Sequence, residues 1–132
     1  LYATFGNGST TFKKYDINAN SWSDLQPALL GPDCGGSLLY PDSGDFIYLL
    51  QGGGSSAFAK YSISGNTWTA LATAPGSAYC GGDLAFPGTG GYIFATVGGV
   101  GGGSGLIIVI LVVLDVFKRG RGRRARRGRP ER

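Results

Sequence analysis

The chain contains no histidine, no methionine and a single glutamate, Glu131, among its 132 residues. Without histidine it lacks the commonest general base and the commonest metal ligand. Two cysteines without a histidine make a poor metal-binding set. No Gly-x-Ser-x-Gly motif and no P-loop occurs either. We therefore predict that this chain is not an enzyme and that it holds no metal and no cofactor.

Charged residues are scarce, and their signs are divided between two regions. Only 15% of the residues are charged and 25 are glycine, which suits a turn-rich β-protein of one domain in size. Residues 1–117 carry three lysines against seven aspartates, a net charge of −4, whereas residues 118–132 carry nine Lys or Arg against one Glu, a net charge of +8. The composition of residues 118–132 predicts a disordered tail. It has no aromatic residues to stack on bases, so we expect at most non-specific contacts with nucleic acid phosphates.

The body of the chain repeats itself at a spacing of 46 residues, without a gap. Residues 15–53 align with residues 61–99 at 15 identical positions of 39, and residues 2–14 continue the same spacing. A period of this length is typical of repeat architectures, in which one unit buries its apolar face against the next.

The sequence of each unit predicts four short antiparallel strands. Residues 33–40 and 45–51 are rich in apolar residues, and residues 41–44 between them have the composition of a hairpin turn. Residues 57–63 alternate between two faces, residues 64–66 indicate a second tight turn, and residues 67–71 contain Trp68. No sustained 3.6-residue period is present. We therefore predict an all-β fold with no helix before residue 105, in which Tyr61 and Trp68 pack in one core.

A double glycine at 52–53, followed by a tyrosine and a tryptophan seven residues apart, resembles the kelch family over residues 1–99. The resemblance implies antiparallel four-stranded propeller blades with the first strand innermost. Tryptophan would fill the wide outer rim of a blade, and the glycine pairs at 35–36 and 81–82 suit crowded inner strands. The structural residues of the repeat are Tyr15, Trp22, Gly35, Gly36, Gly52, Gly53, Tyr61, Trp68, Gly81, Gly82, Gly98 and Gly99.

The repeat divides the chain into five segments. Residues 1–32 contain the last three strands of a preceding blade and a linker, residues 33–72 one complete blade, and residues 73–105 the first two strands of the next blade and a glycine-rich linker. Residues 106–117 are apolar, and residues 118–132 form the tail. Because a propeller closes with at least four blades, we expect an incomplete ring. Either other blades of a longer parent protein or other copies of the chain would complete it.

Cys34 and Cys80 occupy the same position in successive units. A disulfide needs Cα atoms within about 7 Å, and equivalent positions of neighbouring blades are usually farther apart. We therefore predict that both are small buried apolar residues copied with the repeat. A disulfide and a metal or redox role are the alternatives.

The apolar segment 106–117 has two main interpretations. The arginine cluster that follows it is typical of a membrane anchor with a cytoplasmic C-terminus, as in the prokaryotic surface kelch proteins that the chain resembles. Twelve residues of helix span only about 18 Å, however, against a hydrocarbon core near 30 Å. The alternative is a third strand of the last blade, because Ile and Val favour strands. A frame or assembly artefact is a further alternative.

The favoured function is a non-catalytic binding or interaction module of a larger cell-surface or secreted propeller protein, with an unidentified protein or carbohydrate ligand. Loops carry function on rigid scaffolds, and the candidate ligand-binding loop is Gly52, Gly53, Gly54, Ser55 and Ser56. Two alternatives stay open. The chain belongs to a kelch-propeller enzyme whose catalytic residues lie outside it, or its Arg-rich tail binds nucleic acid non-specifically.

Overall fold

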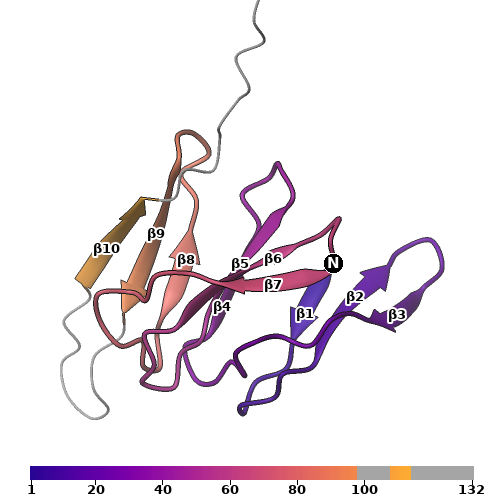
Figure 1. Cartoon of the computed structure of the whole chain (residues 1–132), viewed down its shortest axis with the longest axis horizontal. Coiled ribbons are helices and arrows are strands. Elements are labelled where there is room, and N and C mark those ends of the chain that lie inside the picture. The colour runs from indigo at the N-terminus through magenta and orange to yellow at the C-terminus, as the bar shows by residue number, and fades with distance from the viewer. Residues whose placement is uncertain (98–107, 114–132) are drawn as a thin grey trace, which may run out of the picture.

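The computed structural model describes residues 1–97 and the strand at 108–113 (Figure 1). Every regular element in these residues is a strand: β1 Tyr2–Thr4, β2 Phe12–Asp16, β3 Ser21–Asp24, β4 Ser37–Leu39, β5 Phe46–Leu50, β6 Phe58–Ser62, β7 Thr67–Ala70, β8 Asp83–Ala85, β9 Tyr92–Val97 and β10 Ile108–Val113. The prediction of an all-β chain is confirmed over these residues. The predicted tail at 118–132 and the glycine pair Gly98-Gly99 lie outside the described residues.

The strands form three antiparallel sheets, which lie side by side (Figure 1). The first sheet has the order β1-β2-β3, the central sheet β4-β5-β6-β7, and the third sheet β8-β9-β10. Successive strands of the central sheet are neighbours, so short turns connect them as hairpins. The four strands predicted within residues 33–72 are therefore confirmed as one sheet.

Strand pairing repeats with the same 46-residue spacing as the sequence. Tyr2 pairs with Lys14 in the first sheet, and Tyr48 pairs with Lys60 in the central sheet. Likewise Tyr15↔Trp22 returns as Tyr61↔Trp68, and Leu38↔Leu49 returns as Leu84↔Ala95. A slip of one residue would turn each strand's apolar side chains to the other face, so this agreement keeps the same positions facing the core in each unit.

The central sheet is covered on both faces. Along β5, Ile47 belongs to a core shared with the first sheet, whereas Tyr48 and Leu50 belong to a core shared with the third sheet. The core toward the first sheet contains Phe12, Ile47 and Tyr61, with Tyr2, Leu25, Leu38, Ile63 and Trp68 packed against it. The core toward the third sheet contains Tyr48, Leu50, Phe58, Ala74, Ala78, Leu84, Ile93, Ala95 and Val97. Two-sided burial explains why β5 reads as a continuous apolar run.

A tyrosine, an asparagine and a tryptophan build the hairpin between the last two strands of a unit. Asn66 has a φ of 47°, in the left-handed region that asparagine tolerates better than most residues. Its Oδ1 accepts a hydrogen bond from the Tyr61 hydroxyl at 2.8 Å, and the Trp68 ring packs 5.2 Å from the Tyr61 ring. The predicted packing of Tyr61 and Trp68 in one core is therefore confirmed. The turn geometry explains why the sequence keeps Asn at this spacing.

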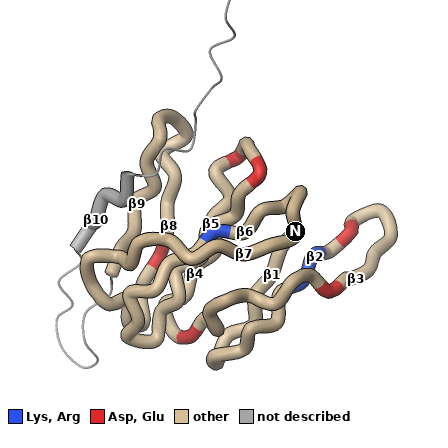
Figure 2. Tube along the Cα trace, viewed as in Figure 1, with Lys and Arg blue, Asp and Glu red and all other residues tan. Residues whose placement is uncertain are grey.

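Acidic residues lie at strand ends and in turns, whereas the lysines lie within β2 and β6 (Figure 2). Asp16 and Asp45 both hold turns. Asp16 Oδ1 accepts hydrogen bonds from the backbone N–H groups of Ala19 and Asn18. Asp45 accepts one hydrogen bond from the side-chain hydroxyl of Ser62 and one from the backbone N–H of Ser64. These hydrogen bonds favour the charged carboxylate and lower the pKa of both residues below the ordinary value. The carboxylates of Asp16 and Asp45 therefore stabilise the turns.

The predicted position of the glycine pairs on the first strand of each unit needs correction. The glycine pairs were placed on inner strands, but β4 begins at Ser37 and β8 at Asp83, so both pairs precede their strands. Gly35 and Gly81 have φ values of 77° and 109°, which suit the turns that lead into these strands.

The apolar segment forms a strand over the part that the structure describes. β10 pairs antiparallel with β9 from Val97↔Ile108 to Tyr92↔Val113. The repeat spacing would pair Thr96 with residue 104, but Thr96 pairs with Val109, five residues later. Residues 108–113 thus agree with the third-strand alternative, and a longer connection precedes them than in the central sheet.

Candidate functional site

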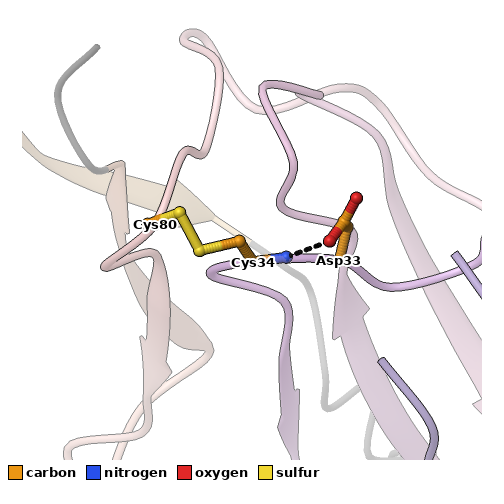
Figure 3. Close-up of a disulfide and its surroundings, with 3 residues drawn as sticks. All are labelled: Asp33, Cys34 and Cys80. Atoms are coloured by element: carbon orange, nitrogen blue, oxygen red, sulfur yellow. Dashed lines mark hydrogen bonds between the residues drawn. A yellow bond between two sulfur atoms is a disulfide. The ribbon is translucent and has the colours of Figure 1, made fainter. Parts of the chain in front are cut away.

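Cys34 and Cys80 form a disulfide that joins the central sheet to the third sheet (Figure 3). Their Cα atoms are 4.7 Å apart, and both residues are exposed. The prediction that these are buried, unpaired residues was therefore wrong. The neighbouring units approach more closely than blades usually do, to about the spacing of two adjacent strands.

Glycine makes this close approach possible. A Cβ on Gly35 would overlap the carbonyl oxygen of Tyr79, and a Cβ on Gly82 would lie 2.5 Å from the carbonyl oxygen of Gly35. Real Cβ atoms do not come so close to backbone atoms. The Cys-Gly-Gly sequence, present in both units, thus combines the crosslink with the small residues that it needs.

Other equivalent residues also meet beside the disulfide. The Ser37 hydroxyl donates to Asp83 Oδ1 at 2.8 Å, and these two residues are again 46 positions apart. The Leu84 N–H in turn donates to the Ser37 hydroxyl at 3.2 Å. The first strands of the central and third sheets therefore lie side by side at the same position of the repeat.

The candidate ligand-binding loop, residues 52–56, packs against both segments that the disulfide connects. The Gly53 N–H donates to the Cys34 carbonyl at 2.7 Å, and the Gly54 N–H donates to the Ala78 carbonyl at 2.8 Å. Ser55 forms a β-bridge with Ala78, and its hydroxyl donates to Gln51 Oε1 at 2.8 Å. These groups are used within the protein, which makes the loop a rigid joint between units.

The exposed residues around this joint define what we call the loop face: Asp33, Cys34, Gly53 and Cys80. The Asp33 carboxylate accepts a hydrogen bond from the Cys34 N–H at 2.7 Å (Figure 3). A Cβ on Gly53 would lie 2.8 Å from Cβ of Asp33, so the loop is held against this residue. The loop face offers a carboxylate, a disulfide and backbone groups on a fixed scaffold, a set that suits binding.

Within the described residues, no group of three or more His, Cys, Asp or Glu side chains is placed to hold a metal ion. Nor does any helix among them have the length and apolar character needed to cross a membrane.

The repeated tryptophans have different surroundings in the first and central sheets. Trp68 packs against the core, 5.0 Å from the Phe12 ring, whereas Trp22 is 48% exposed. Trp22 does contact Tyr15, with ring centroids 5.1 Å apart. Trp68 is therefore packed against a core, whereas none of the described sheets covers the exposed side of Trp22, and the placement of both tryptophans at the rim of a blade stays a prediction.

Nothing in the sequence pattern indicated a role for Gln26. Its backbone N–H donates to Asn66 Oδ1 at 2.9 Å, and its carbonyl accepts from Trp68 Nε1 at 3.1 Å. Leu25 beside it packs into the core between the first and central sheets. Only the main chain of Gln26 is recognised, so the side-chain sequence carries little signal for this contact.

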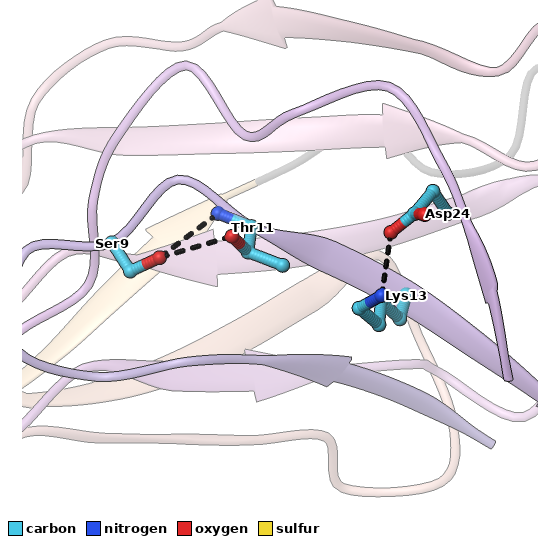
Figure 4. Close-up of polar contacts among 4 residues, drawn as sticks. All are labelled: Ser9, Thr11, Lys13 and Asp24. Atoms are coloured by element: carbon cyan, nitrogen blue, oxygen red, sulfur yellow. Dashed lines mark hydrogen bonds and ion pairs between the residues drawn. The ribbon is translucent and has the colours of Figure 1, made fainter.

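The outer surface of the first sheet carries polar pairs. Lys13 on β2 and Asp24 on β3 face each other in the strand register and form an ion pair at 2.7 Å (Figure 4). Ser9 and Thr11 form a local pair in which the Thr11 N–H donates to the Ser9 hydroxyl at 3.3 Å (Figure 4). An exposed ion pair contributes roughly 0–1 kcal/mol, so these contacts position β2 and β3 without deciding their stability.

The chain matches no protein-family model and no curated protein. Its function is therefore inferred from its own sequence and structure.

Proposed function

We propose that this chain is a non-catalytic binding and interaction module, built from propeller-type blades similar to those of the kelch family. The observation that carries the proposal is the repetition of strand register at the 46-residue spacing, with the central sheet covered on both faces. Units that stack in this way form a rigid scaffold, and each unit needs a neighbour on either side.

The disulfide supports a cell-surface or secreted location. Disulfides form and persist in oxidising compartments, and thiols are kept reduced in the cytosol. Here the crosslink joins equivalent positions of two units, so it belongs to the way that the units stack. Because residues 108–113 pair with β9, the proposal includes no membrane anchor at this segment.

We place the ligand contact at the loop face. Binding sites often lie on loops that a rigid framework positions, and residues 52–56 are held by hydrogen bonds to two neighbouring segments. The exposed Asp33 carboxylate gives this face a negative charge that a cationic or hydrogen-bond-donating group can approach. The partner is an extracellular protein or a carbohydrate.

A binding screen with two matched variants tests this proposal. The oxidised protein is immobilised and screened against panels of extracellular proteins and glycans, together with Asp33→Asn and Asp42→Asn. Both substitutions remove one exposed carboxylate, but Asp42 lies in the turn between β4 and β5, outside the loop face. A ligand whose binding weakens severalfold in Asp33→Asn and not in Asp42→Asn supports the loop face. Ligands that bind both variants equally, or no ligand in either panel, contradict it.

A further inference from the structure

In the central sheet, two side chains bind the backbone N–H and C=O of one residue, an arrangement that we call the clamp. Asn66 Oδ1 accepts the N–H of Gln26, and Trp68 Nε1 donates to the carbonyl of the same residue. An acceptor in the turn between β6 and β7 and a donor on β7 thus bond to both polar groups of one backbone residue. Leu25, directly before it, packs in the apolar cluster with Trp68.

The clamp is fixed by the hairpin that carries it. Asn66 holds its left-handed conformation at φ 47°, and the Tyr61 hydroxyl donates to its Oδ1. The Trp68 ring lies against Tyr61 at 5.2 Å, which sets the direction of the indole N–H. The acceptor and the donor are therefore preorganised before a segment arrives, which lowers the entropic cost of binding.

The first sheet carries a second copy of this arrangement. Asn20 has a φ of 48°, the Tyr15 hydroxyl donates to Asn20 Oδ1, and the Tyr15 and Trp22 rings lie 5.1 Å apart. These features match the central copy residue by residue at the 46-residue spacing.

No segment of the described part of the chain covers the copy in the first sheet, in contrast to the copy in the central sheet. Trp22 is 48% exposed and Ile17 is 78% exposed, whereas the equivalent Trp68 and Ile63 pack against a core. Among the described residues, no main-chain group bonds to Asn20 Oδ1 or to Trp22 Nε1. An acceptor, a donor and an apolar contact surface are thus present without a segment across them.

We infer that Tyr15, Ile17, Asn20 and Trp22 form a binding site for an extended polypeptide segment. In that segment a leucine-like residue precedes a residue whose backbone N–H and C=O are both available, as Leu25 precedes Gln26. The apolar residue covers Ile17 and Trp22, and the following amide bonds to Asn20 and Trp22. This site lies on the first sheet and does not depend on the loop face.

The internal contact identifies the occupant as a peptide. The same two side-chain types, Asn and Trp, bind a main-chain segment in the central sheet, where both hydrogen bonds go to backbone groups of the bound residue. The N–H and the C=O of a backbone residue have a fixed spacing. A site whose acceptor and donor match that spacing therefore selects for a polypeptide. Sequence selectivity comes only from the apolar residue before the amide.

The test uses a peptide of the chain's own residues 23–30, Ser-Asp-Leu-Gln-Pro-Ala-Leu-Leu, with blocked ends, added to the intact oxidised protein. The two indole N–H signals, from Trp22 and Trp68, are followed by NMR, and Trp22→Phe assigns them. We expect the Trp22 signal to move downfield with saturation. A control peptide with a methylated amide nitrogen at the glutamine loses one hydrogen bond and binds roughly threefold to tenfold more weakly.

A pair of protein variants locates the site. Asn20→Gly keeps the left-handed backbone but removes the acceptor, and Asn20→Asp keeps an acceptor oxygen at the same place. We expect the peptide to lose most of its affinity for Asn20→Gly and to keep it for Asn20→Asp, while the thermal midpoints of both variants show that they are folded.

Three results would overturn the inference. One is a Trp22 signal that does not move, another is equal binding to Asn20→Gly, and the third is a Trp22 signal that moves with neutral oligosaccharides and not with the peptide. A concentration-dependent shift of Trp22 without peptide, lost in Asn20→Gly, would support the site and identify a second copy of the chain as the source of the segment.

Discussion

The two interfaces of the central sheet use different chemistry for the same repeat. Toward the first sheet, aromatic rings meet at Phe12, Tyr61 and Trp68, and the Gln26 main chain is clamped. Toward the third sheet, the stacked rings of Tyr48 and Phe58 lie among small and aliphatic side chains, and the exposed Cys34–Cys80 disulfide links the two sheets beside this core. Stacking is therefore set by the repeated strand register, and each interface is then stabilised by its own residues.

Removal of the disulfide should have the largest effect, and only on one interface. In the chain-entropy model a crosslink that closes 46 residues contributes about 4 kcal/mol. We expect Cys34→Ser with Cys80→Ser to lower the free energy of unfolding by about that amount, measured by denaturant titration.

Hydrogen exchange tells whether this loss is local. Amides of β8 and β9 should exchange faster in the double variant, and those of β2 and β3 should be protected as before. Uniformly faster exchange across all three sheets would mean that the interfaces are not independent.

Trp68→Ala should have the next largest effect, on the other interface. It removes a large ring from the core and leaves the Gln26 carbonyl without its donor, so we expect a loss of about 3 kcal/mol. Trp22→Ala is the matched control and should cost less than about 1 kcal/mol, because Trp22 is half exposed. Equal losses by thermal or chemical denaturation would contradict the assignment of Trp68 to a core.

The glycine at the disulfide allows a sharper comparison. Gly35 and Gly8 have nearly the same φ, 77° and 73°, but a Cβ on Gly8 meets nothing within 4 Å. Both Gly→Ala substitutions should cost about 1 kcal/mol for the left-handed backbone. Gly35→Ala should cost roughly 1–3 kcal/mol more, because of its overlap with the Tyr79 carbonyl. Denaturation midpoints that agree for the two variants would exclude close approach as the reason for Gly35.

Protonation of Asp45 at low pH should have the smallest effect on the stability of the protein. Hydrogen bonds from Ser62 and Ser64 lower its pKa in the folded protein below 3.8. Its contribution to stability is therefore complete above the unfolded pKa and is lost as the pH falls through the lower, folded pKa. Asp45→Asn should flatten the decline of stability below about pH 4, the ordinary range for aspartate. An unchanged pH profile would show that these hydrogen bonds carry no net stability.

Sequence periodicity predicted the strands, the turns and the packing of Tyr61 on Trp68, because each depends on a pattern within one unit. It failed where two units meet. The Cys34–Cys80 crosslink depends on how closely the backbones approach at Gly35 and Gly82, and a period carries no distance between units.

The candidate site shows the same limit. Residues 52–56 were predicted to bind a ligand because loops carry function on rigid scaffolds, but in the structure the backbone N–H groups of Gly53 and Gly54 are bonded to Cys34 and Ala78. The contact of Gln26 uses backbone atoms, which are the same in every residue, and so leaves no trace in the sequence. The different burial of Trp22 and Trp68 depends on the neighbouring sheet, which identical residues do not reveal.

The most direct test of unit stacking is a mass-spectrometric peptide map of the protein without reduction. Equivalent residues of successive units meet in this structure, so Cys34 and Cys80 should be recovered as one linked peptide pair from monomeric protein. Recovery of both cysteines as free thiols, or as a crosslink between two chains, would contradict the stacking of 46-residue units described here.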